Sequence, residues 1–490
     1  MKKSKILVIN EPFIRNFCRP QRWAAKTRGR AMRAPDWLAY ATAVLEKNNF
    51  DVELYDFAAR NWDKRYLFQL ISIKKPAVVV LDSSTPSIYS DIECAKICKK
   101  ASKDTFVIMV GPHATSNYEE VLKLAEGNID AIARGEYDYT VLEIVQRILS
   151  GDQGDILSDC LGVSYIYQGT IKNNPDRPLI ENLDELPFPA YHFLNIMDYF
   201  DGGKLYPYLT IIGGRGCPFR CTFCLWPQVM HGRRYRLRSA ENIIEEIEYS
   251  LKKWPLLKYG EFFFEDDTFT ASLKRAHRFC DLLLEKNIKI TWSLNARADI
   301  IDEELFRKMK LSGARTFWLG IESMDQNILN NVKKGITVEQ IENFIRTVHK
   351  YKLQVHGCFI LGLPGETKET MEYTLKKSLE IGVDTLQFSA VVPFPGTEYF
   401  EYCEKNNLLL TKEWDKWLTA GEQGTVVTYP GLTKEEIEKN VNRGLAQFYF
   451  RPSFLIKFLL KSKNLSDIYR KFRGGWNFVN YLIENLFERM

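Results

Sequence analysis

Three cysteines within eight residues are the most specific chemical signal in this chain. Cys217, Cys221 and Cys224 are spaced Cys-x3-Cys-x2-Cys, and an aromatic residue, Phe223, directly precedes the last of them. Three thiolates can hold three irons of a [4Fe–4S] cluster, whereas an electron-transfer ferredoxin uses a fourth cysteine. The fourth iron then stays open to a small molecule, so the spacing predicts a cluster at which a reaction takes place.

Two other interpretations of these cysteines are weaker. Cys221 and Cys224 could be half of a zinc site, but such a site needs a second Cys/His pair. His231 follows seven residues later without a further pair after it. A disulfide needs an oxidising compartment, and the start of the chain, MKKSKILVIN, has too short an apolar run for a signal peptide. We therefore expect reduced cysteines and a cytoplasmic protein.

Alternating strand-like and helix-like segments surround the cysteines in residues 205–400. The expected strands are 208–213, 261–265, 289–294, 316–319, 354–361 and 385–391, with helices near 240–253, 273–286, 303–311, 338–351 and 368–381. Such a pattern predicts a partial (β/α)6 barrel, whose reactive groups gather at the C-terminal strand ends. The cysteine loop directly follows the first expected strand, as that arrangement requires.

A different α/β unit is predicted for residues 1–149. Apolar strands at 5–9, 51–56, 76–81, 105–110 and 129–133 alternate with helical stretches that include 37–48 and 139–149. This order predicts a doubly wound parallel sheet with helices on both faces, and ligands bind beyond the C-terminal strand ends of such sheets. Residues 150–204, stiffened by Pro187 and Pro189, are expected to be a linker. Residues 401–490 are expected to be mostly helical.

The cysteine spacing, the preceding aromatic residue and the six-strand pattern resemble the radical S-adenosylmethionine (SAM) enzymes. The resemblance implies that SAM binds the open iron through its amino and carboxylate groups. One electron from the cluster then breaks the S–C5′ bond, and the 5′-deoxyadenosyl radical takes a hydrogen atom from an unactivated carbon. A flavodoxin or ferredoxin is the kind of electron donor this implies.

The same resemblance assigns SAM contacts to the expected strand ends. Glu265 and Asp266 match the position that holds the SAM amino group, and Asn295 and Arg297 follow the third strand, where Arg297 could pair with the SAM carboxylate. Glu322 matches a contact to a ribose hydroxyl or to the amino group. Gly362 and Gly365 lie in a segment that is similar to the adenine-binding segment of the family.

The loops of the N-terminal unit resemble the cobalamin-binding domain that precedes many radical SAM domains. The resemblance rests on Ser83-Ser84-Thr85, Gly111-Pro112-His113 and Arg134-Gly135-Glu136. It implies cobalamin contacts by six residues: Ser83, Ser84, Gly111, His113, Gly135 and Glu136. The Asp-x-His-x-x-Gly pattern of cobalt-ligating domains is absent from the sequence, so cobalamin would be held without a histidine on cobalt. The alternative is a domain that kept the fold and lost the cofactor.

Residues 224–228, 231–239 and 264–270 resemble radical SAM proteins associated with hopanoid biosynthesis and their archaeal lipid-modifying relatives. This implies rearrangement, cyclisation or C-methylation of a small hydrophobic substrate derived from a lipid or isoprenoid. A cobalamin-dependent C-methyltransferase of a non-lipid natural product and a tRNA-modifying radical SAM enzyme are the alternatives. The remaining alternative is a non-enzymatic metal-binding protein. Nucleic acid is not an expected partner.

Positive charge is concentrated in two places. Residues 451–490 contain eight Lys/Arg and three Asp/Glu, an excess equal to the net charge of +5 of the whole chain. Basic and apolar residues together are typical of an interfacial helix, so this tail is expected either to contact a membrane surface or to pack on the barrel. Seven further cations and no acid lie between residues 12 and 35, where they could meet a phosphate or remain solvated.

Overall fold

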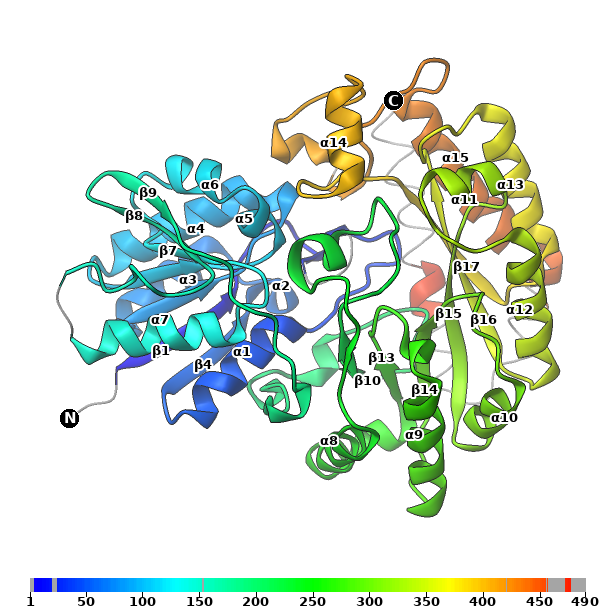
Figure 1. Ribbon diagram of the computed structural model, residues 1–490, viewed down its shortest axis with the longest axis horizontal. Helices are drawn as coiled ribbons and strands as arrows, with labels where there is room; N and C mark the ends of the chain where they lie inside the picture. Colours follow the sequence, from blue (N-terminus) through cyan, green and yellow to red (C-terminus); the bar gives the residue numbers. More distant parts are fainter. Residues whose placement is uncertain are drawn as a thin grey trace.

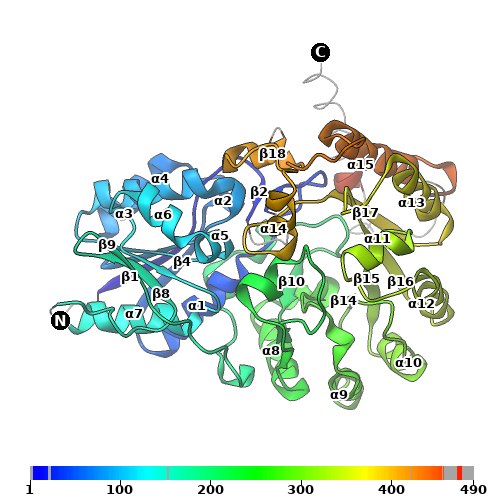
Figure 2. The same cartoon turned by 45° about the horizontal axis from the view of Figure 1, so that its top comes forward.

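The computed structural model describes residues 4–19, 24–151, 154–419, 421–454, 456 and 472–476. The N-terminal α/β unit and the barrel lie side by side (Figure 1). The segment that carries α14 (Glu398–Lys405) sits over the junction between them, which is visible also after rotation (Figure 2). The two units therefore meet along an extended junction.

The N-terminal sheet has seven strands in the order β4 (Asp51–Asp56), β1 (Lys5–Asn10), β5 (Val78–Leu81), β6 (Phe106–Met109), β7 (Ala131–Ala133), β8 (Val163–Tyr167) and β9 (Thr170–Asn173). The first five are parallel, and the β8–β9 hairpin extends the sheet antiparallel. The doubly wound parallel sheet is thus confirmed. The hairpin comes from the stretch expected to be a linker.

Helices cover both faces of this sheet. Alternate residues of β1 belong to two separate apolar clusters: Ile6 and Val8 to one, Leu7 and Ile9 to the other. The first cluster includes residues of α1 (Asp36–Lys47) and α7 (Asp138–Ser150), and the second includes residues of α3 (Lys64–Lys74), α4 (Ile88–Ala101) and α6 (Tyr118–Ala125). Strands buried on both faces explain the continuous apolar runs in the sequence.

The second sheet is a six-stranded parallel partial barrel, as predicted. Its order is β10 (Tyr208–Ile211), β13 (Glu261–Phe264), β14 (Trp292–Ala296), β15 (Ala314–Glu322), β16 (Gln354–Leu361) and β17 (Thr385–Ala390). The outer helices are α8 (Ala240–Lys253), α9 (Leu273–Glu285), α10 (Glu303–Leu311), α12 (Val338–Lys350) and α13 (Lys368–Glu380). Each begins after a Ser, Thr or Asp whose side chain accepts a hydrogen bond from a backbone N–H of the first turn, which explains where these helices start.

The chain after the barrel is helical in its described part, with α14 and α15 (Lys434–Tyr449). It also supplies β18 (Leu418–Thr419) and β19 (Glu422–Gln423) to a small sheet with β3 (Ala25–Lys26) and β2 (Phe17–Cys18). Most of the tail expected to form an interfacial helix lies outside the described residues. Among the helices described, none combines the length and apolar character that crossing a membrane requires.

Cations of the N-terminal loop are paired with acidic side chains of the protein. Arg19 donates to Asp91 at 2.8 Å, and Arg33 contacts both Asp36 at 3.0 Å and Glu265 at 2.8 Å. These guanidinium groups are buried, so their charge is balanced inside the protein. The Arg33–Glu265 pair also joins the N-terminal unit to the barrel.

Two further buried ion pairs connect the units through the hairpin of β11 (Gly214–Arg215) and β12 (Arg236–Leu237). Arg215 donates to both carboxylate oxygens of Asp138, at 2.6 and 3.2 Å. Arg236 donates to Glu136 Oε2 at 2.7 Å. Glu136 lies in the loop after β7 and Asp138 is the first residue of α7, both at the C-terminal edge of the first sheet, so the pairs hold the barrel's hairpin against that edge.

A tight loop follows β16. Gly362 has a φ of +87° and Gly365 a φ of +85°, which side chains with a Cβ rarely adopt. The backbone N–H groups of Gly362 and Leu363 donate to the carboxyl group of Glu366. Burial raises the pKa of Glu366 to about 8, although these hydrogen bonds lower it. The carboxyl group therefore stays protonated in the folded protein at neutral pH.

We expect Arg236→Met to destabilise the protein by about 1–3 kcal/mol, because the buried Glu136 carboxylate loses its hydrogen bonds from Arg236 and keeps only Arg215 at 4.0 Å and His231 at 3.3 Å beside it. The measurement is the free energy of unfolding in urea. Arg278→Met is the matched control, since Arg278 pairs with Glu241 on the exposed surface, where a lost ion pair has little effect. Equal losses for the two variants would contradict the role of the buried pair.

The raised pKa of Glu366 predicts that the free energy of unfolding depends on pH differently in the wild type and in a variant without this carboxyl group. Its folded pKa of about 8 lies above the unfolded value of 4.5, so between these values the folded state binds more protons and stability falls as pH rises. Glu366→Gln removes this dependence. The variant should therefore gain stability relative to the wild type between pH 5 and pH 8, measured by urea unfolding at both values. Glu380→Gln should show no such trend, and a flat difference for Glu366→Gln would refute the assignment.

Candidate active site

A cavity of about 1510 Å³ runs through the barrel. The three cysteines line one end of it, and residues at or just before the start of strands β14 to β16, Thr291, Ala314 and Gln354, line the other. Small-molecule pockets commonly measure about 300–1,000 Å³. The cavity is therefore large enough for a cofactor and a substrate together.

The cysteine loop is held in one conformation by its own backbone and neighbours. Gly216 has a φ of +85°, and a Cβ at this position would lie 2.2 Å from the carbonyl oxygen of Arg234. The Gln228 side chain donates to the carbonyl oxygens of Thr222 and Cys224, at 3.0 and 2.7 Å. Gln228 lies in a π-helical turn, Trp226–Met230, a form that is frequent at functional sites.

The cysteines suit a cluster better than a single metal ion. All ten cysteines lie in the described part of the chain, and none forms a disulfide. Cys217, Cys221 and Cys224 are partly exposed to the cavity. Within the described ranges, no group of three or more His, Cys, Asp or Glu side chains could hold a metal ion. A cubane cluster does not require such close grouping, because each thiolate binds a different iron.

Six of the other seven cysteines are buried, whereas Cys358 is partly exposed and lines the cavity from β16. Burial raises the pKa of Cys18, Cys280 and Cys403 to about 12, so their thiols stay protonated. A thiolate is the form that binds a metal. The fit of the cluster therefore rests on the three cysteines of the loop.

Four of the predicted SAM-contacting side chains line the cavity beside the cysteines: Glu265, Asn295, Arg297 and Glu322. They come from the C-terminal ends of three strands, β13, β14 and β15, or from the loops that follow them. The Arg297 guanidinium lies 3.4 Å from the ring centroid of Phe219 in the cysteine loop and donates to Asp299 at 3.0 Å. Carboxylate, amide and guanidinium groups in one place suit the charged amino-acid part of SAM.

Three other predicted SAM contacts do not line the cavity. Asp266 is buried in a network in which it accepts from the Gly213 backbone at 2.6 Å, Tyr235 at 2.7 Å and Arg275 at 2.9 Å. Gly362 and Gly365 form the loop after β16 described above. Asp267, the residue after Asp266, does line the cavity. The sequence did not identify it, because nothing in the sequence distinguishes which of two adjacent aspartates faces the cavity.

Lys334 was also missed by sequence analysis. It is only 6% exposed, lines the cavity and donates to Glu322 at 2.6 Å. Burial alone would lower its pKa, but Glu322 and Cys221 raise it overall. Lys334 therefore stays charged and positions the Glu322 carboxylate. It lies in a loop between two helices, where no local pattern distinguishes it from a surface lysine.

Three residues predicted to contact cobalamin line a small pocket at the C-terminal edge of the first sheet: Ser83, Ser84 and Gly111. The Ser83 hydroxyl donates to the carbonyl oxygen of Val110 at 2.6 Å, and the Ser84 hydroxyl lies 2.6 Å from that of Ser87. A Cβ on Gly111 would lie 2.5 Å from Asp82 Oδ1 and from the Ser83 carbonyl oxygen. This glycine is therefore needed for two loops to approach each other.

The other three residues predicted to contact cobalamin lie at the same edge of the sheet but do not line this pocket. His113 Nδ1 lies 3.2 Å from the Thr85 hydroxyl, and burial lowers the pKa of His113 to about 3, so it stays neutral. The backbone N–H of Gly135 donates to Thr115 Oγ1 at 3.2 Å. Glu136 is the partner of Arg236 in the ion pair that joins the two units.

The small pocket has a volume of only about 30 Å³, close to that of one water molecule. Leu225, Trp226 and Phe394 line both this pocket and the large cavity. The position suits a flat cofactor whose edge meets the strand-end loops and whose body extends over the barrel mouth. The small pocket alone could not hold one, so the fit to cobalamin requires the space shared across these three side chains.

Comparison with known proteins agrees with this geometry. Residues 211–378 match the family model described as the radical SAM superfamily, and residues 34–145 match the B12 binding domain. An uncharacterized methyltransferase of Pyrococcus horikoshii, PH0819, is 35% identical over 428 residues, covering 86% of this chain and 89% of that protein. The anaerobic magnesium-protoporphyrin IX monomethyl ester cyclase of Rubrivivax gelatinosus is 30% identical, over 75% of this chain and 66% of that protein.

A solved structure shows the same fold. The radical SAM methyltransferase TsrM from Kitasatospora setae, with cobalamin and a [4Fe–4S] cluster bound, superposes with a TM-score of 0.71 at 15% identity and covers 99% of this chain and 100% of that chain. The hopanoid C-3 methylase of Methylococcus capsulatus is 24% identical over 72% of this chain and 65% of that protein.

Each of the two family models matches part of one sheet, and the alignment with PH0819 spans most of both proteins. SAM, a [4Fe–4S] cluster and cobalamin are the cofactors that these domains imply. This chain belongs to the cobalamin-binding radical SAM enzymes.

Proposed function

We propose that this enzyme transfers a methyl group to an unactivated carbon of a large, mainly apolar substrate. The observation that carries the proposal is that Leu225, Trp226 and Phe394 line both the cysteine-lined cavity and the strand-end pocket of the first sheet, so the two spaces adjoin there. A radical generated on one side and a methyl carrier on the other would meet the same substrate there. The similarity to methyltransferases also supports it.

The protein's own residues would bind and orient the reactants. Cys217, Cys221 and Cys224 would hold the cluster, while Glu265, Asn295, Arg297 and Glu322 would hold SAM. When bound, the cluster and SAM supply a carbon-centred radical and cobalamin supplies a transferable methyl group. The barrel contributes a cavity whose apolar walls exclude water and leave the radical few partners other than the substrate.

The substrate class favoured by the sequence resemblance is a lipid or an isoprenoid derivative. The aromatic lining of the cavity, which includes Phe263, Trp318 and Phe388, suits such a molecule. It would suit an apolar macrocycle equally well, and a relative with 30% identity is named a magnesium-protoporphyrin IX monomethyl ester cyclase. Ring closure is therefore the second candidate reaction.

The first test is mass spectrometry of the SAM products of anaerobically reconstituted protein with dithionite, cobalamin and a lipid extract. Methyl transfer predicts both 5′-deoxyadenosine and S-adenosylhomocysteine, whereas ring closure predicts 5′-deoxyadenosine alone. Cys224→Ala should abolish both products and lower the bound iron. Cys280→Ala, a cysteine of the barrel core, is the control and should retain both products. Products that persisted in Cys224→Ala would contradict the role of the cysteine loop.

A second test concerns SAM binding. We expect Glu322→Gln to weaken SAM affinity about ten- to a hundredfold, because hydrogen bonds to charged groups contribute about 1.5–3 kcal/mol. Equilibrium dialysis with the unreduced cluster measures this without turnover. Glu398→Gln, on the exposed surface, should bind SAM as the wild type does. An unchanged affinity in Glu322→Gln would remove Glu322 from the proposed SAM site.

A further inference from the structure

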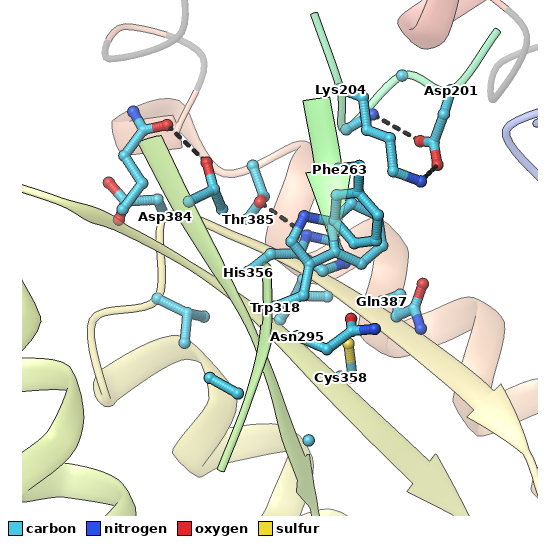
Figure 3. A pocket seen from close by; sticks show the side chains of 18 of the residues that line it. Asp201, Lys204, Phe263, Asn295, Trp318, His356, Cys358, Asp384, Thr385 and Gln387 are labelled. Carbon is cyan, nitrogen blue, oxygen red and sulfur yellow. Dashed lines mark hydrogen bonds and ion pairs between the residues drawn. The ribbon is translucent and has the colours of Figure 1, made fainter. Parts of the chain in front are cut away.

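One row of side chains crosses the middle of the barrel. Asn295, Trp318, His356 and Thr385 are partners in register on the adjacent strands β14, β15, β16 and β17. Residues in register on parallel strands point to the same side of the sheet, and all four line the cavity (Figure 3). Asn295 is assigned above to SAM, whereas Trp318, His356 and Thr385 are not assigned to the cluster, SAM or cobalamin.

Two buried polar atoms in this row have no hydrogen-bond partner. They are the indole Nε1 of Trp318 and the imidazole Nε2 of His356, although a side-chain hydrogen bond with Gln387 raises the pKa of His356. His356 is only 6% exposed, its Nδ1 lies 2.8 Å from the Thr385 hydroxyl, and its ring lies 4.1 Å from that of Trp318. Leaving such a group unsatisfied costs about 1–3 kcal/mol, which a bound ligand would recover.

The surroundings indicate that the ligand's polar group is uncharged. Lys204 lies over the rings of Phe263 and Trp318, at 4.2 and 4.7 Å, and pairs with Asp201 at 2.7 Å (Figure 3). Arg315, at the same end of the cavity, pairs with Glu261 at 2.7 Å. Both cations are therefore already balanced by carboxylates. Burial lowers the pKa of His356 to about 4, although Asp201 raises it, so His356 is also neutral.

The backbone brings these groups together at one fixed depth. Gly203 lies close to the Trp318 ring, and a Cβ at this position would be only 2.8 Å from that ring. The Gly203 N–H donates to Asp201 at 2.9 Å. The next row towards the cysteines contains Gly320, Cys358 and Gln387, and the small size of Gly320 and Cys358 leaves room above Trp318. Trp318 lies four residues before Glu322, or about 13 Å along the strand.

We propose that Trp318 and His356 form a substrate-binding subsite that takes a neutral oxygen, such as a ketone, ester or amide carbonyl, of an otherwise apolar substrate. The indole N–H can only donate, so its partner must be an acceptor. The aromatic walls suit the apolar body of the molecule, which would extend towards the cysteines. As a substrate site, the subsite rests on the function proposed above.

The test compares 2-acetylnaphthalene with 2-ethylnaphthalene, which differ only in the carbonyl oxygen. Binding is measured by ligand-observed NMR on full-length, cluster-containing protein with SAM and cobalamin and without reductant. The wild type should bind the ketone about five- to tenfold more tightly, as one or two buried hydrogen bonds imply. Trp318→Phe and His356→Phe should each reduce this preference to about twofold or less, while the affinity for the hydrocarbon changes little.

Trp417→Phe is the matched control. Trp417 also has a buried indole N–H without a partner, but it lies in the apolar cluster of the N-terminal sheet and does not line the cavity. This variant should keep the full preference for the ketone. Equal binding of the two probes to the wild type, binding of neither, or a preference retained in both cavity variants would overturn the proposal.

The same preparations separate this proposal from the proposed reaction. Analysis of SAM products after reduction tests the reaction and does not involve the naphthalene probes. A preference for the ketone without any SAM product would overturn only the reaction. SAM products without the preference would overturn only the subsite.

Discussion

The two buried ion pairs between the C-terminal edge of the first sheet and the β11–β12 hairpin are the constraint on which the site depends. Burying a guanidinium or a carboxylate is costly unless its partner is also present. Arg215 and Arg236 flank the cysteine loop on both sides, and their partners, Asp138 and Glu136, come from the other unit. The cysteine loop can therefore adopt its position only when the two strand edges face each other.

Aromatic stacking reinforces the same junction. The Arg215 guanidinium lies 5.0 Å from the ring of Trp37, which lies 4.3 Å from His231, and His231 stacks on Trp226 at 5.4 Å. The chain of contacts runs from α1 of the first unit to the π-helical turn after Cys224. Charge balance continues at the strand ends, where Arg33 pairs with Glu265 and Lys334 with Glu322. An incoming SAM would thus meet carboxylates that are already oriented.

Much of this arrangement could be predicted from the sequence because it has local causes. The strands have continuous apolar runs, the helices have capping residues, and the cysteines have a spacing that few other sites share. What could not be predicted depends on contacts between distant segments: the pairing of Arg33 with Glu265, the placement of Lys334, and the two-residue strands β2 and β3. Asp266 and Asp267 are adjacent residues of the same type, and only the direction of each side chain decides which one reaches the cavity.

The barrel separates two tasks along each strand. β15 ends in Glu322 beside the cysteines and carries Trp318 about 13 Å earlier, while β14 carries Asn295 and is followed by Arg297. The groups that we assign to SAM lie at or near the strand ends, and Trp318 and His356, which we propose to face a substrate, lie in the row that begins with Asn295. A substitution in a middle row should change the cavity without moving the strand ends. The reason is that residues in different rows pair with different residues on the neighbouring strands. Such a division would allow proteins named for a hopanoid and for a magnesium porphyrin to match the same chain over about three quarters of its length.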